Sequence, residues 1–184
     1  MSNRLAVVMY CPGAGGAFLT HVLHSEIYNL TALSDEHTGL EGLCKFRKTD
    51  KTLNSLNNLI TINGWELEDF ISYADARNIQ FDLVALNFNN PEMSMFGRRV
   101  LELKHDTSVF PRYTVEGFEL ANEMYSKYEN LICCTLDYKK IFFDRDTKEL
   151  QNLIDWTYSK ISMKALKRIL TTYTDLHIKL VNDN

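Results

Sequence analysis

A glycine-rich turn near the start of the chain has the residue types that bind an anion through the backbone. An apolar run over residues 5–10 leads into this turn, and a helical pattern over residues 16–30 follows it. Glycine tolerates positive φ, and a strand–turn–helix junction points free N–H groups and the positive end of the helix dipole at one small volume. The alternative is a tight connection that binds nothing, because short glycine motifs are common. The residues predicted to surround a phosphate or sulfate are Pro12, Gly13, Ala14, Gly15, Gly16, Ala17 and Phe18.

Two histidines are candidates for moving a proton beside an anion bound at this turn. His37 follows Asp35 and Glu36, either of which could orient its imidazole ring, and His21 lies one turn into the helix behind the turn. Histidine exchanges protons near neutral pH and is therefore a frequent general base. The alternative for each is a structural or solvent-facing side chain.

A second polar segment follows a later apolar run. Residues 81–88 have the composition of a buried strand, and Asn89-Asn90-Pro91 ends it, because proline removes a backbone donor and restricts the residue before it. A helical pattern over residues 91–105 contains Ser94 and Arg98. The carboxyl edge of a parallel sheet is where α/β folds bind ligands, so this segment is a second candidate for contacting an anion.

Strand and helix patterns alternate along the chain. Strands are predicted at residues 5–10, 60–62, 81–88 and 131–136, and helices at 16–30, 65–78, 91–105, 115–128, 147–160 and 162–181, with a weak helical pattern at 53–59 and a long, mobile loop at 34–50. The strands are continuous apolar runs, as in parallel sheets that are covered on both faces. We therefore predict one doubly wound α/β domain over residues 1–184, with a mainly parallel sheet, helices on both faces and a C-terminal helical segment at 147–182.

Composition limits the classes of partner and compartment. The formal net charge of −4 disfavours a nucleic-acid-binding protein, and no apolar run is long enough to cross a membrane. The four cysteines lack the spacing of a zinc site and are expected to be reduced, as in a cytoplasmic protein. Cys11 adjoins the glycine-rich turn and is predicted to be a small packing residue, with an activated nucleophile as the alternative.

Three places together resemble the sulfotransferase family, which has a P-loop-like fold. In that family the first strand ends in a proline-containing loop whose amides hold the 5′-phosphosulfate of 3′-phosphoadenosine 5′-phosphosulfate (PAPS), and residues 12–19 take this place. A later strand ends in arginine-asparagine-proline with a serine downstream, which bind the 3′-phosphate, and Asn89-Asn90-Pro91 with Ser94 are the counterparts. The third place is a late strand that leads into a tyrosine- and acid-containing turn, here residues 136–141.

This resemblance implies a three-layer sandwich of the P-loop or sulfotransferase type. It also implies a transferase that moves a sulfuryl group from PAPS, a small anionic nucleotide, to a hydroxyl or amine of an unspecified acceptor without a metal ion. The cofactor-binding residues would be the seven of the turn together with Asn89, Ser94 and Arg98, and the base His37 or His21.

The chain differs from the family at positions where the family has charged or hydroxyl side chains. Gly13 replaces the loop lysine, Gly16 and Ala17 replace loop hydroxyls, and Asn89 replaces the arginine, although Arg98 could compensate. One alternative is therefore a catalytically degenerate nucleotide- or anion-binding accessory protein. Another is a P-loop nucleotide kinase or phosphatase, although the glycine-lysine-serine/threonine signature of that class is missing.

Overall fold

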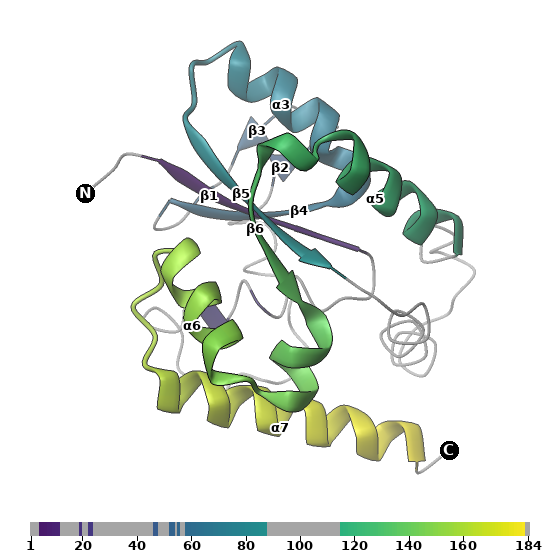
Figure 1. The fold of residues 1–184 in the computed structure, drawn as a ribbon, viewed down its shortest axis with the longest axis vertical. Coiled ribbons are helices and arrows are strands. Elements are labelled where there is room, and N and C mark those ends of the chain that lie inside the picture. Colours follow the sequence, from purple (N-terminus) through teal and green to yellow (C-terminus); the bar gives the residue numbers. More distant parts are fainter. Residues whose placement is uncertain are drawn as a thin grey trace.

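A four-stranded parallel sheet forms the centre of the protein (Figure 1). The computed structural model describes residues 4–11, 19, 22–23, 46–47, 52–53, 55, 58–87 and 115–182. The strands of the sheet are β1 (Leu5–Tyr10), β4 (Leu59–Asn63), β5 (Phe81–Asn87) and β6 (Ile132–Asp137), in the spatial order β4-β1-β5-β6. All three pairings are parallel, so the prediction of a mainly parallel α/β fold is confirmed.

The strand register brings four strand ends together. Tyr10 pairs with Asn63 on one side and with Leu86 on the other, and Asn87 pairs with Asp137. Because the strands are parallel, these residues lie along one edge of the sheet, which we call the carboxyl edge. The opposite end, where β1, β5 and β6 begin, is the amino edge.

Helices cover both faces of this sheet. Figure 1 shows α3 (Leu67–Asp75) and α5 (Val115–Lys127) on one side of the strands, and α6 (Thr147–Trp156) and α7 (Met163–Asn182) on the other. The short helical segments are η2 (Gly64–Glu66), η5 (Glu129–Leu131) and the π-helix η6 (Lys140–Asp144). The helices predicted at 65–78, 115–128, 147–160 and 162–181 are thus confirmed, with shorter ends for the first and third.

The two faces of β1 belong to separate hydrophobic cores. Leu5, Val7 and Met9 pack in the core beneath α3, which includes Phe70 and Met124. Ala6, Val8 and Tyr10 pack in the core beneath α6 and α7, which also takes in Leu19, Val22 and Leu23 of the segment after the glycine-rich turn. Every residue of β1 is buried, as expected for the inner strand of a parallel sheet.

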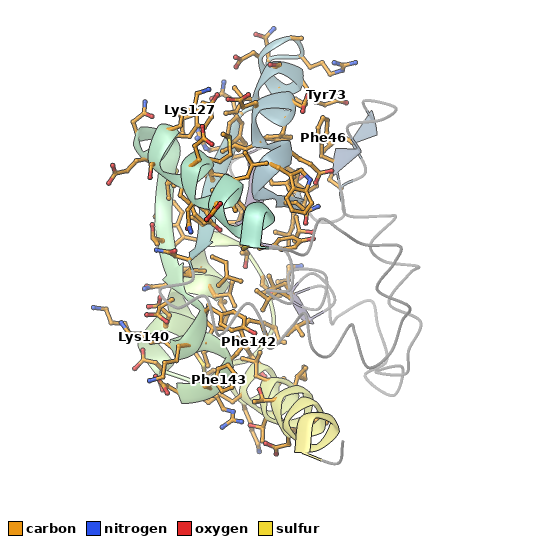
Figure 2. The ribbon with its side chains drawn as sticks, turned by 90° about the vertical axis from the view of Figure 1, so that its right-hand side faces the viewer. Phe46, Tyr73, Lys127, Lys140, Phe142 and Phe143 are labelled. Atoms are coloured by element: carbon orange, nitrogen blue, oxygen red, sulfur yellow. The ribbon has the colours of Figure 1, made fainter. Side chains whose placement is uncertain are left out.

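A short antiparallel ribbon lies against α3, and it corrects one expectation. The ribbon pairs β2 (Phe46–Arg47) with β3 (Thr52–Leu53), so the helix predicted from residue 53 is wrong at its start, and β2 falls within the predicted loop 34–50. Figure 2 shows Phe46 beside Tyr73, and their ring centroids lie 5.2 Å apart. Phe46 is fully buried and also contacts the Phe70 ring edge-on at 5.6 Å. This long-range burial of an aromatic side chain decides the extended conformation, which local propensity does not show.

Within the described ranges, no helix is both long and apolar enough to cross a bilayer.

Candidate functional site

The order of the strands determines where their connections diverge at the carboxyl edge. The chain runs from β1 to β4 on one side of β1, and then crosses to β5 on the other side of β1. Connections that leave two neighbouring strands in opposite directions form a topological switch point, where open α/β sheets bind their ligands. The switch point of this sheet lies between β1 and β5.

The strands that precede the two predicted anion-binding segments end at this switch point. The glycine-rich turn starts directly after Cys11, and the Asn89-Asn90-Pro91 segment starts two residues after the end of β5 at Asn87. Tyr10 and Leu86 are register partners, so the two starting points are adjacent. The predicted residues themselves all lie outside the described part of the chain: Pro12, Gly13, Ala14, Gly15, Gly16, Ala17, Phe18, His21, His37, Asn89, Ser94 and Arg98.

Cys11, the residue after β1, is a buried thiol beside this switch point. Only 1% of the residue is exposed, and burial raises the pKa of the thiol to about 12. At neutral pH the thiol therefore keeps its proton, and a thiol is a far weaker nucleophile than a thiolate. This environment favours the packing interpretation of Cys11 over the nucleophilic one.

Acidic side chains occupy the carboxyl edge on either side of the switch point. At the end of β4, Glu66 accepts hydrogen bonds from the Asn63 backbone N–H at 3.1 Å and from its side-chain amide at 2.9 Å. At the end of β6, Glu149 accepts from the Asp137 backbone N–H at 2.5 Å, and Asp146 caps α6 by accepting from the Glu149 N–H at 2.9 Å. The starts of α3 and α6 are therefore already complemented by carboxylates and would repel a further anion. Of the places described at this edge, the β1–β5 switch point is the one without such a carboxylate.

The third place of the family resemblance forms a compact turn after β6. Asp137 Oδ1 accepts from the Lys140 N–H at 3.0 Å, and the π-helix η6 follows directly. Tyr138 is buried, with its ring centroid 4.6 Å from that of Phe142. The chain after β6 is therefore helical, and both of these aromatic side chains belong to the core.

Helix α5 packs beside the switch point, and this packing was not predicted from the sequence. Ala121 approaches the start of η2 so closely that a Cβ on Gly64 would lie 2.9 Å from the Ala121 Cβ. One turn later, the Tyr125 hydroxyl donates to the Leu86 carbonyl at 2.7 Å. Burial and the neighbouring Cys11 raise the pKa of Tyr125 well above its ordinary value, so the phenol stays protonated. The sequence signal for these two contacts is the i, i+4 spacing of Ala121 and Tyr125. Ordinary core packing of a helix produces the same spacing, so the spacing alone does not indicate a position beside the switch point.

A second polar cluster lies at the amino edge, far from the switch point along the strands. Arg4 Nε donates to Asp82 Oδ1 at 2.8 Å, and the Tyr158 hydroxyl donates to Asp82 Oδ2 at 2.5 Å. These contacts tie the start of β1 and the end of α6 to β5. The cluster consists of paired groups and stabilises the fold.

Comparison of the chain with protein-family models, with curated proteins and with solved structures finds no match.

Proposed function

We propose that this chain binds a nucleotide of the PAPS type at the β1–β5 switch point and transfers its sulfuryl group to a hydroxyl or amine. One observation supports the proposal: β1 and β5, the strands that precede the glycine-rich segment and the Asn89-Asn90-Pro91 segment, are neighbours with Tyr10 opposite Leu86. Two segments far apart in the sequence are thereby available to hold the two phosphate-bearing ends of one ligand.

The roles in this proposal follow from the residue types. Backbone amides of residues 12–18 would hold the 5′-phosphosulfate, while Asn89, Ser94 and the guanidinium of Arg98 would hold the 3′-phosphate. In the transfer, the acceptor oxygen or nitrogen bonds to sulfur, the S–O bond to the 5′-phosphate breaks, and His37 or His21 takes the acceptor proton. Amides aimed at the charge that develops on the leaving phosphate would stabilise the transition state.

Binding without transfer is the second candidate function. Gly13 stands where a lysine would balance the leaving charge, and the described ends of β4 and β6 carry the carboxylates of Glu66 and Asp137. A site with this charge balance can hold a nucleotide through backbone donors and still fail to stabilise the transition state.

Thermal unfolding with added nucleotide tests the binding step. We expect 3′-phosphoadenosine 5′-phosphate to raise the Tm in a concentration-dependent way, and ATP with Mg²⁺ to have no effect. Gly15→Val should abolish the shift in a variant whose circular dichroism is unchanged, because the branched side chain blocks approach to the backbone. No shift with wild-type protein would reject the proposal, and a shift with ATP and Mg²⁺ alone would favour a kinase or phosphatase.

A pair of arginine variants tests the 3′-phosphate contact. Arg98→Ala should weaken binding of the same nucleotide by about ten-fold, since a charged hydrogen bond contributes on the order of 1.5–3 kcal/mol. Arg77→Ala is the matched control, because the Arg77 guanidinium lies over the Tyr73 ring on α3 at 3.9 Å from its centroid. Equal affinities of the two variants would remove Arg98 from the site. Transfer of a labelled sulfuryl group to amine and alcohol acceptors then separates an enzyme from a protein that only binds.

A further inference from the structure

Helix α5 contacts the ends of two strands at the carboxyl edge. Ala121 contacts Gly64, the residue that follows β4, and Tyr125 contacts Leu86 near the end of β5. Tyr125 also lies close enough to Cys11, the residue after β1, for the thiol to influence its pKa. One stripe of α5 thus contacts the ends of β4 and β5, the two strands that flank β1.

The Tyr125 ring reaches over the sheet edge. The two hydrophobic cores lie on opposite faces of the sheet, and Tyr125 packs against both of them. Ala121 of the same helix is itself a buried member of the core beneath α6 and α7, so this stripe of α5 meets that core where Tyr125 bonds to Leu86, at the carboxyl edge. The neighbour of Tyr125, Met124, packs in the core beneath α3 alone, as expected for a residue facing the sheet.

We propose that Tyr125 is a positioning residue for the switch point: its hydroxyl holds the Leu86 carbonyl, and through it sets where the chain leaves β5 beside the end of β1. This inference rests on the proposed function for the identity of the ligand. The hydroxyl fixes a backbone group rather than the ligand itself, so its role is to keep the ends of β1 and β5 at a constant separation. Preorganised donors bind an anion more tightly than donors that must first be ordered.

A pair of tyrosine variants separates this role from general stabilisation. Tyr125→Phe removes one hydroxyl and keeps the ring, whereas Tyr128→Phe, three residues later on α5, removes a hydroxyl that donates to the exposed Glu68 carboxylate at 3.1 Å. Each variant loses one hydrogen bond of the same donor type, and only Tyr125 bonds to the carboxyl edge.

Two measurements on both variants test the inference. Hydrogen–deuterium exchange should show amides at residues 9–11 and 85–87 exchanging about five-fold faster in Tyr125→Phe, relative to residues 5–6 and 82–83 at the amino edge, as expected when one hydrogen bond is lost locally. The Kd for 3′-phosphoadenosine 5′-phosphate, measured by calorimetry, should rise by about five-fold in Tyr125→Phe for the same reason and stay constant in Tyr128→Phe.

The outcomes are distinguishable. Exchange that is equal at both edges, or equal in the two variants, overturns the positioning role. Faster exchange at the carboxyl edge with an unchanged Kd overturns the link between Tyr125 and the ligand. Faster exchange there in a protein whose wild type binds no nucleotide supports the positioning of the strand ends and rejects the proposed function.

Discussion

Replacing Gly64 by alanine is expected to disturb the contact between α5 and the end of β4. The added Cβ would lie 2.9 Å from the Ala121 Cβ and 3.0 Å from the Ala121 Cα. The second of these atoms is backbone, so relief requires α5 or η2 to move. Overpacking of this kind lowers the free energy of unfolding by about 1–3 kcal/mol. Replacing glycine by alanine also restricts the unfolded chain, which raises the free energy of unfolding by about 0.4–1 kcal/mol. The net expectation is a free energy of unfolding lower by about 0–2.6 kcal/mol, with a midpoint of about 1.3 kcal/mol, or a Tm lower by up to about 10 °C for a domain of this size.

A double-mutant cycle attributes the loss to this contact. In an Ala121→Gly background the closest atom is removed and only the 3.0 Å contact with the Cα remains, which a shift of a few tenths of an ångström relieves. Gly64→Ala should therefore cost less there than in wild type, with a coupling of about 1 kcal/mol between the two sites. Urea unfolding of the four proteins measures the coupling.

Ala74→Gly provides the control background. Ala74 is also a fully buried alanine in a helix, and it lies near the far end of α3 from Gly64. Gly64→Ala and Ala74→Gly should therefore be additive within about 0.5 kcal/mol. Additivity in both backgrounds would refute the argument, because it would mean that α5 does not rest against Gly64.

Two further predictions concern ionisable side chains. Burial opposes the ionisation of Asp82, but hydrogen bonds from Arg4 and Tyr158 outweigh it and hold its pKa below the ordinary value. Asp82→Asn should therefore lower the free energy of unfolding by about 1–2 kcal/mol at neutral pH. Because the folded-state pKa is depressed, this stabilisation is complete above the unfolded pKa of about 3.9 and is lost as the pH falls through the folded value. A wild-type advantage that stays constant in urea unfolding from neutral pH to about pH 2 would contradict this reasoning. For the thiols, mass spectrometry after iodoacetamide treatment should find the exposed Cys133 alkylated well before the buried Cys11, whose raised pKa keeps it protonated. Equal rates in the folded protein would show that Cys11 is accessible.

Local patterns in the sequence predicted most of the described elements. Each of the four strands of the sheet corresponds to an apolar run, and the acidic first turn of α3, with Glu68 and Asp69, marks a helix start before the structure is known. Such features depend on side chains a few residues apart, which the sequence displays directly. The ribbon of β2 and β3 was not predicted from local patterns, because Phe46 packs against Phe70 and Tyr73 rather than against its neighbours in the chain.

The sequence by itself determined that an apolar strand precedes a glycine-rich turn and that a later strand precedes an asparagine-proline segment, since both are properties of consecutive residues. Only the tertiary structure decided that these strands are neighbours and that Tyr10 lies opposite Leu86. It also decided that the Tyr125 hydroxyl donates a hydrogen bond to the Leu86 carbonyl. The physical reason is that strand order and helix docking depend on burial between residues dozens of positions apart, and many orders of the same strands would satisfy the same local pattern.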